Sequence, residues 1–448
     1  MDTLGLTDII GPIMVGPSSS HTAGALRIAF MARRLCLADP AAVEFRLLGS
    51  FAHTLTGHGT DKALVAGMLG METDDLRIRD SFNLAERAGL AFSFHTLPDA
   101  DYDHPNTIDI RIVDAAGNAM DVRGESIGGG AAVIRKIDDI DVYITGESTS
   151  IVVRQRDEKG VLAHIAHCIT EQDVNIATTR MYRERKGEIA YTVLETDQAV
   201  GAEAKAAIED HPAILDVRII PGDTRPGCSR IDVPDAADAL QRFAELDFAN
   251  GAALLAYCEA HEASLSEAFL AREAALAATL GYADNAACYL DEALGVMKRS
   301  AQQPIDEALP SMGGLIGGEA RKLADLHRRG GELCDDQLSR ATAYAMAVLE
   351  TNASMGRIVA APTAGSSGVL PGVLLALQHT RGYADADLAR ALAAAAAIGY
   401  LITRNATVSG AKGAVRPRSA RPPPWPPRRP SSSWAARPRN ASPRPATR

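Results

Sequence analysis

The sequence predicts an α+β protein with three consecutive units: a mixed α/β unit, a ferredoxin-like unit and an all-helical unit. Strand-like and helix-like segments alternate over residues 1–140. Residues 142–220 follow the order β-α-β-β-α-β of a ferredoxin-like unit. From Ile231 to Asn405 the apolar residues recur at helical spacing, and strand-type alternation is missing.

The first unit shows both kinds of periodicity. Residues 42–51 and 90–97 are rich in β-branched and aromatic residues, as strands are. The sequence Ala-Ala-Gly-Asn at 115–118 predicts a hairpin between two further strands. Apolar residues at helical spacing predict helices over Thr22–Leu35 and Thr60–Leu69.

The second unit is expected to open with one strand over residues 142–155 and a helix after Gly160. The segment RDEKGVLAHIAHCITEQDVNI resembles the opening of an ACT domain, a type of domain that commonly binds amino acids for regulation. Gly160 would let the backbone approach a ligand carboxylate at the helix start. Alternatively, Gly160 only makes the turn, and the unit mediates dimerisation.

The rest of the chain divides by composition. Residues 221–230 are predicted to be a linker, and residues 231–411 a helical unit with Gly-rich interruptions. Residues 412–448 hold nine Arg, one Lys and no acidic residue, so this segment carries +10. The whole chain carries −10, which leaves −20 for residues 1–411. The last segment is therefore a different kind of sequence.

Composition excludes several classes of protein. The negative charge argues against a nucleic-acid partner. No stretch reaches the ~20 apolar residues of a membrane helix, and the N-terminus lacks the features of a signal peptide, so we expect a cytoplasmic protein without a membrane partner. The six cysteines form no CxxC pair, which predicts neither a disulfide framework nor a zinc site.

The motif GPSSSHTAG (16–24) is the strongest candidate site. Hydroxyls and free N–H groups before a helix bind anions such as carboxylates. These hydroxyls belong to Ser18, Ser19, Ser20 and Thr22. His21 could act as an acid or base near neutral pH. The alternative is a plain helix N-cap, which a single serine would favour.

Two further turns each carry a histidine. The motif GHGTD (57–61) places His58 and Thr60 at another helix start, and HPN (104–106) places His104 and Asn106 before a strand. Each is weak alone, because a lone histidine is more often a surface or packed residue. Three such turns in one small unit predict convergence on one pocket.

The helical unit repeats the pattern once. The motif APTAGSSGVLPG (361–372) puts the hydroxyls of Thr363, Ser366 and Ser367 before a helix. Asn352 and Asn405 flank it, and either could bind a polar substrate group or cap a helix. No lysine lies in a context that would hold pyridoxal phosphate.

In this order, the motifs and the ACT-like segment resemble bacterial iron–sulfur-dependent L-serine dehydratase (L-serine ammonia-lyase) over residues 1–411. The resemblance implies a β domain at 1–140, an ACT domain at 142–220 and an α domain at 231–411. It implies conversion of L-serine to pyruvate and ammonia by a 4Fe–4S cluster acting as a Lewis acid, without pyridoxal phosphate. We expect a homodimer, and an amino-acid effector at Gly160.

Site residues carry over with the motifs. The resemblance implies that Ser18–Thr22, His58 with Thr60, and His104 with Asn106 line the serine pocket. The turn at Thr363–Ser367 would help to close it. His58 and His21 are the candidates for removing the Cα proton.

The chain departs from the family after residue 411. Family members continue after SGA with GGC and QAEVGSASAM, and that cysteine and two later ones hold the cluster. Here KGAVRPRSARPPPWPPRRP follows, and no cysteine comes after Cys334. The resemblance therefore leaves the chain without metal ligands and predicts an inactive form with a truncated α domain, whose apolar faces should be exposed.

A one-base deletion explains this segment. A codon series for KGGCQAEVGSASAMAA that loses one G encodes KGAVRPRSARPPPWP, which is residues 412–426. The codons in this series are selected to give both amino-acid sequences. The match therefore shows that a one-base deletion is consistent with the sequence. The hypothesis is out-of-frame translation from about Ala414, and the alternative is a natural Arg-Pro-rich disordered tail.

Two other function classes compete. One is a non-catalytic amino-acid-binding ACT protein. The other is a hydrolase that uses Ser18–Ser20 with His21, but adjacent residues rarely hold triad geometry, and no Asp that would orient the histidine is evident.

Overall fold

The structure is a computed structural model that describes residues 4–183, 185–222, 236–331 and 334–406. Within these ranges it is a mixture of helices and strands, which confirms the α+β prediction. Most of the predicted linker and the Arg/Pro-rich segment 412–448 lie outside the described residues.

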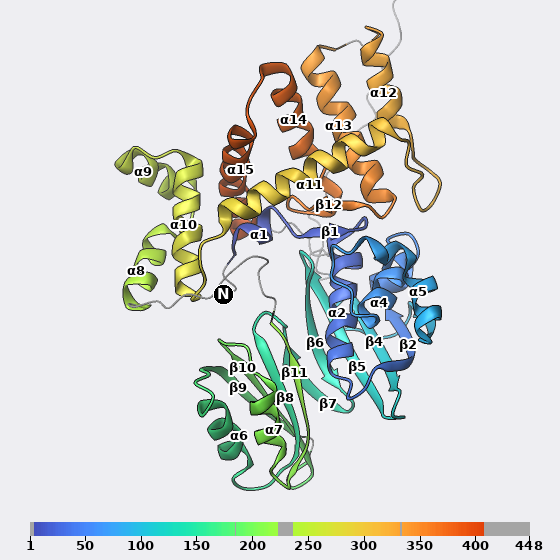
Figure 1. Ribbon diagram of the computed structural model, residues 1–448, viewed down its shortest axis with the longest axis vertical. Coiled ribbons are helices and arrows are strands. Elements are labelled where there is room, and N and C mark those ends of the chain that lie inside the picture. The colour runs from blue at the N-terminus through green and yellow to red at the C-terminus, as the bar shows by residue number, and fades with distance from the viewer. Residues whose placement is uncertain (1–3, 184, 223–235, 332–333, 407–448) are drawn as a thin grey trace, which may run out of the picture. The chain divides into compact units, whose positions relative to one another are not determined.

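A six-stranded sheet organises the first part, in the order β3-β2-β4-β5-β6-β7. Only β2 and β3 pair in parallel. The helices α2, α4 and α5 lie together over this sheet (Figure 1). The elements are α2 (Gly24–Arg34), β2 (Pro40–Leu48), α3 (Gly49–Thr54), α4 (Thr60–Met68), a 3₁₀ turn (Leu76–Asp80), α5 (Ser81–Ala88), β3 (Ala91–Leu97), β4 (Thr107–Asp114), β5 (Ala119–Gly128), β6 (Ala131–Ile137) and β7 (Ile140–Ile144).

The single strand expected over residues 142–155 is wrong. The chain forms β7, then a turn, then β8 (Thr149–Arg156), and β7 completes the six-stranded sheet by pairing with β6. Gly146 adopts a φ of 70°, which breaks an extended strand and which glycine tolerates best.

The second part has the expected β-α-β-β-α-β order. Its antiparallel sheet runs β11-β8-β10-β9. Ile151 and Val153 on β8 pack against the helices, whereas Val152 between them joins the core of the six-stranded sheet. This alternation covers both faces of the small sheet. The elements are β8, α6 (Val161–Thr170), β9 (Ile176–Arg183), β10 (Ile189–Thr196), α7 (Ala202–Glu209) and β11 (Ile214–Ile220).

The third part is helical, as the periodicity predicts, except for the strand β12 (Arg357–Val359). Three residues are too few for a recognisable alternation of apolar and polar positions. The helices are α8 (Ala236–Leu246), α9 (Gly251–His261), α10 (Leu265–Thr279), α11 (Ala286–Asp306), α12 (Glu319–Arg328), α13 (Asp336–Ala353), the 3₁₀ turn Ala364–Ser366, α14 (Val369–Arg381) and α15 (Asp385–Asn405).

The N-terminal segment packs with the helical part rather than with the sheet that follows it in sequence. It contains α1 (Leu6–Ile9) and β1 (Ile13–Val15). Ile9 and Met14 are buried in the same apolar core as α10, α11 and α15. β1 pairs antiparallel with β12, in a register that places Ile13 opposite Val359.

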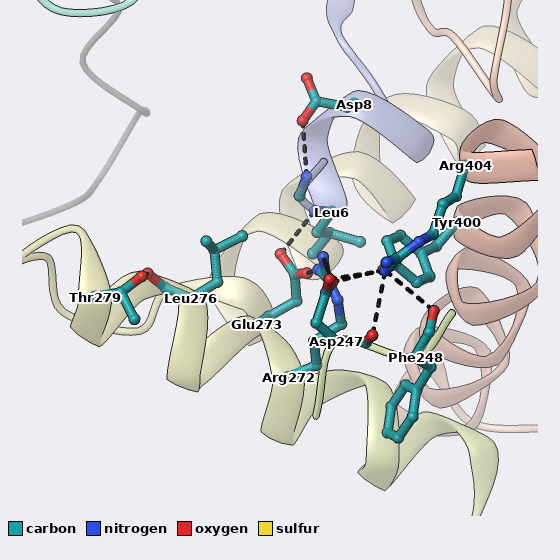
Figure 2. Close-up of polar contacts among 11 residues, drawn as sticks. Leu6, Asp8, Asp247, Phe248, Arg272, Glu273, Leu276, Thr279, Tyr400 and Arg404 are labelled. Carbon is teal, nitrogen blue, oxygen red and sulfur yellow. Dashed lines mark hydrogen bonds and ion pairs between the residues drawn. The ribbon is translucent and has the colours of Figure 1, made fainter. Parts of the chain in front are cut away.

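A buried charge network holds this segment (Figure 2). The Arg272 guanidinium on α10 is fully buried and donates to Glu273 (2.7 Å) and Asp247 (3.0 Å). It stacks on the Tyr400 ring at 4.0 Å. Glu273 also accepts the Leu6 amide at 2.7 Å. The network thus ties α1 and α10 to α15.

Helix α15 corrects one expectation from the sequence. It spans 21 residues, and an 18-residue window within it has a mean hydropathy of 1.4, so among the described residues it is long and apolar enough to cross a membrane. It also buries Leu392, Ala396 and Tyr400 in the helical core. Length and composition are therefore weak evidence for a membrane span here.

Apolar side chains are exposed on the last helices. Val369 on α14 is 65% exposed, and Ile398 and Ile402 on α15 are each 52% exposed. Large apolar side chains are also exposed elsewhere, among them Leu240 and Leu315, so the truncation of the helical unit stays a prediction.

We predict that Arg272→Ala costs about 3–5 kcal/mol of stability, because it leaves Glu273 and Asp247 without their buried partner. The matched control is Arg390→Ala, which removes a largely exposed pair with Asp387 and should cost about 1 kcal/mol or less. Urea denaturation monitored by circular dichroism measures both. Equal losses for the two variants would contradict the anchoring role of Arg272.

Candidate active site

The SSSHT turn lies where β1 runs into α2. A short π-helix (Ser19–Ala23) opens α2, and Ser18 caps it, because its Oγ accepts the His21 N–H at 3.0 Å. The N–H groups of Ser19 and Ser20 open the helix and have no intrahelical acceptor by position. Such N–H groups can bind an anion, so the anion-binding role that the motif indicates stays a prediction.

The His21 ring is held by hydroxyl groups on both sides. Its Nδ1 lies 3.2 Å from Ser18 Oγ and 3.0 Å from Ser20 Oγ. Its Nε2 lies 2.8 Å from Ser50 Oγ. The sequence motifs did not include Ser50. Its position two residues after the end of β2 was the available signal.

The GHGTD turn contacts the SSSHT turn. The ring centroids of His21 and His58 are 4.9 Å apart. Thr22 Oγ1 donates to the His58 carbonyl at 2.7 Å. The two histidine turns therefore meet, as their shared pattern suggested.

The HPN turn joins them through α3 and β5. The Ser50 amide donates to the Pro105 carbonyl at 2.6 Å. Asn106 Nδ2 donates to the Ser126 carbonyl at 3.3 Å. Gly24 packs so closely on Ser126 that an added Cβ would lie 2.1 Å from its Oγ. His104 accepts the Asn106 amide through Nδ1 at 3.2 Å.

Four polar atoms around these turns are buried without a hydrogen-bond partner among the described residues. They are His58 Nδ1, Thr60 Oγ1, Asn106 Oδ1 and Ser126 Oγ. Burying such groups unpaired costs free energy, so native proteins usually pair them with water or a ligand. A polar ligand or ordered water would satisfy them here.

Burial favours the neutral form of both histidines. Burial, and then the nearby charge of His58, lowers the pKa of His21 to about 4. Burial also lowers the pKa of His58. A neutral imidazole can accept a proton at neutral pH, which the charged form cannot do.

The helical part contributes Met355 at this site. Its Sδ lies 3.0 Å from where a Cβ on Gly16 would be, and 2.9 Å from the same position on Gly59. Met355 is fully buried with a φ of 59°. Met355 therefore packs against the turns that contain Gly16 and Gly59 and covers the site with an apolar side chain.

The turn that contains Thr363, Ser366 and Ser367 is bonded within itself and to α13. Thr363 Oγ1 lies 2.9 Å from Ser366 Oγ, and Ser367 Oγ donates to the Ala364 carbonyl. Asn352 Nδ2 donates to the same carbonyl at 2.9 Å. Within the described residues none of these hydroxyls hydrogen-bonds to the histidine turns, so their role in the pocket stays a prediction.

The remaining candidates lie apart from the histidine turns. Gly160 precedes α6 with a φ of 92°, and an added Cβ would meet nothing within 4 Å. Asn405 donates to the Leu401 carbonyl near the end of α15. Gly160 thus leaves open space at a helix start, and Asn405 acts as a helix-end contact.

A metal cluster finds no ready ligand set in the described part of the chain. Its cysteines lie on separate elements: Cys36 follows α2, Cys168 lies on α6, Cys258 on α9, Cys288 on α11, and Cys334 precedes α13. No group of three or more potential metal-binding side chains occurs there. The described residues do not fit the three-cysteine site that the family resemblance implies.

The arrangement has a clear chemical capacity. Free N–H groups can bind a carboxylate, unpaired hydroxyl and amide oxygens can bind polar groups, and a neutral imidazole can take a proton. These features suit a small polar amino acid.

Comparisons with known proteins cover both halves of the chain. Residues 6–89 match the family described as serine dehydratase beta chain, and residues 184–417 match serine dehydratase alpha chain. The second match spans more than half of the chain.

Individual relatives agree. The L-serine dehydratase beta chain of Peptoniphilus asaccharolyticus is 42% identical over 201 residues, which are 45% of this chain and 90% of that protein. The probable L-serine dehydratase alpha chain of Bacillus subtilis is 40% identical over 124 residues, 28% of this chain and 41% of that protein. The L-serine dehydratase of Streptomyces coelicolor is 28% identical over 416 residues, 89% of this chain and 72% of that protein. The chain therefore belongs to the L-serine dehydratase family of carbon–nitrogen lyases and joins its beta-chain and alpha-chain regions in one polypeptide.

Proposed function

We propose that the histidine turns bind L-serine, the substrate that the relatives' names give. The free N–H groups of Ser19 and Ser20 hold its carboxylate, and the unpaired oxygens of Thr60 and Asn106 take its other polar groups. His104 supports this set as a positioning residue, because it accepts the Asn106 amide. The observation that carries the proposal is the group of four buried, unpartnered polar atoms.

His58 is the better candidate for accepting the Cα proton. Its Nδ1 is buried and has no partner among the described residues, whereas both His21 ring nitrogens lie near serine hydroxyls. His21 then holds the ring of its neighbour through their contact at 4.9 Å.

The family resemblance implies a 4Fe–4S cluster for loss of the hydroxyl group. The cysteines that the structure describes lie on separate elements and form no ligand set for it, so we propose that this chain binds L-serine without turning it over. We propose that the cluster cysteines are missing because the reading frame departs from that of the family near Ala414. We place the protein in the cytoplasm as a homodimer, without a nucleic-acid or membrane partner, on composition and resemblance alone.

A second candidate is an amino-acid-binding protein that uses the ACT-like unit. The open space at Gly160, before a ten-residue helix, favours it. Gly160→Asp would place a carboxylate where the ligand carboxylate is expected, and Asp tolerates positive φ better than most residues. Loss of L-serine binding in this variant, with binding unchanged in Thr60→Val, would favour the second candidate.

We predict that the chain forms no pyruvate from L-serine above a blank, even after anaerobic iron and sulfide treatment. The control is the same gene with one G inserted after the Gly413 codon, which should restore the cysteine-bearing frame and activity. A coupled assay of pyruvate with lactate dehydrogenase measures both. Turnover by the uncorrected chain would contradict the missing-ligand account.

We predict that Thr60→Val weakens L-serine binding about tenfold, because one ligand hydrogen bond is lost, without lowering the melting temperature. The hydroxyl it removes has no partner among the residues that the structure describes. The control is Thr351→Val, whose buried hydroxyl donates to the Ser300 carbonyl at 2.7 Å. That variant should melt earlier and bind normally. Calorimetry and thermal melts test both, and the reverse pattern would refute the site.

We predict that acid destabilises the fold through His21. Its folded pKa of about 4 lies below the ordinary 6.5, so the unfolded chain binds more protons between these values, and stability falls as pH drops through this window. From pH 7 to pH 5 the loss is about 2 kcal/mol. His21→Gln should remove most of this loss, whereas the exposed His167→Gln should not. An unchanged pH dependence in His21→Gln would contradict the burial of a neutral ring.

A further inference from the structure

A cleft of about 470 Å³ lies between the end of α2 and the outer strand β11. One wall is formed by residues 33–34 at the end of α2 and by residues 36–40, which lead into β2. The other wall is formed by Lys205 on α7 and by residues 217–219 on β11. Its volume falls within the range of about 300–1,000 Å³ that small-molecule sites occupy.

The lining of this cleft is cationic. Arg33, Arg34, Lys205 and Arg218 face one acidic residue, Asp39, which gives the lining a formal charge of +3. Residues 1–411 carry −20 overall, so this concentration of positive charge is the opposite of its surroundings. A cleft lined by one sign of charge focuses the field and attracts ions of the other sign.

Arg218 is built into the cleft floor. It is 8% exposed, and its Nε pairs with Asp216 at 2.8 Å. Its Nη1 lies 3.2 Å from the sulfur of Met120, which is a weak acceptor. Among the described residues no oxygen accepts from its Nη groups. A buried guanidinium with unused donors is the kind of group that holds an oxyanion.

The other cations are also weakly engaged. Arg34 stacks on the Phe30 ring at 5.1 Å and forms no ion pair within the described residues. Lys205 lies 3.8 Å from Glu209, and both side chains are 41% exposed. Arg33 is already occupied by the Met68 carbonyl and by Asp39, so it shapes the wall rather than supplying free donors.

We propose that this cleft binds a small oxyanion of two or more negative charges, of the phosphate or dicarboxylate class. The anion bridges Arg34 on α2 with Lys205 and Arg218 of the second unit. Helix α2 carries the His21 turn at its other end, about 16 Å away for eleven residues. The anion therefore acts as an effector that fixes α2 against the second unit. This proposal does not rest on L-serine being the substrate.

The test measures binding of inorganic phosphate to the full chain by equilibrium dialysis in an amine buffer. The double variant Arg34→Ala with Lys205→Ala removes two cations from exposed or half-exposed positions. The matched control, Arg87→Ala with Lys159→Ala, removes the same charge from exposed positions outside the cleft. Succinate forms a second arm, and potassium chloride at equal ionic strength forms a third.

We expect saturable phosphate binding that the control pair leaves unchanged and the cleft pair weakens at least about tenfold. Bound phosphate should also raise the melting temperature of the wild-type chain but not that of the cleft variant. Competition by succinate would show that charge is recognised, and its failure would show that the tetrahedral shape is required. Unsaturable binding, equal binding by both variant pairs, or the same stabilisation by chloride would overturn the proposal.

Discussion

The site depends on how the N-terminal segment is held in the helical core. Arg272 keeps Glu273 in place, and Glu273 accepts the Leu6 amide. The three-residue pairing of β1 with β12 then fixes the segment a few residues later. Because only Gly16 and Pro17 separate β1 from Ser18, these contacts set the position of the SSSHT turn relative to the helical part.

A dry environment explains the chemistry of the turns. Met355 covers Gly16 and Gly59 from the helical side, and Phe51 packs edge-on against the His21 ring. Excluding water disfavours the charged imidazole, which is why the pKa values of both histidines fall. The same burial makes the unpaired oxygen of Thr60 costly without a ligand. Burial away from water therefore explains both the neutral histidine rings and the unsatisfied hydrogen-bonding groups.

Sequence patterns predicted the structural features that depend on neighbouring residues in the chain. The helix that starts at Thr60 follows from apolar spacing, and the turn at Ser18 follows from a capping residue. The β-α-β-β-α-β order follows from periodicity. Sequence analysis did not predict that Ser50 and Met355 belong to the site. A single hydroxyl after a strand and a single methionine form no recognisable motif, and both residues reach the site only through tertiary packing. The association of residues 6–14 with the helical part escaped for the same reason, since short apolar segments do not specify their partners.

Nitrogen-15 NMR of the histidine side chains in the full chain, with and without L-serine, tests most directly whether buried histidines form the L-serine site. Ring nitrogen shifts report the protonation state, the tautomer and nearby ligands together. We expect the His21 ring to stay neutral at pH 6, and the signals of both His21 and His58, assigned by substitution, to move when L-serine is added. If the His21 and His58 rings titrate at their ordinary pKa and their signals do not change when L-serine is added, the proposed site is contradicted.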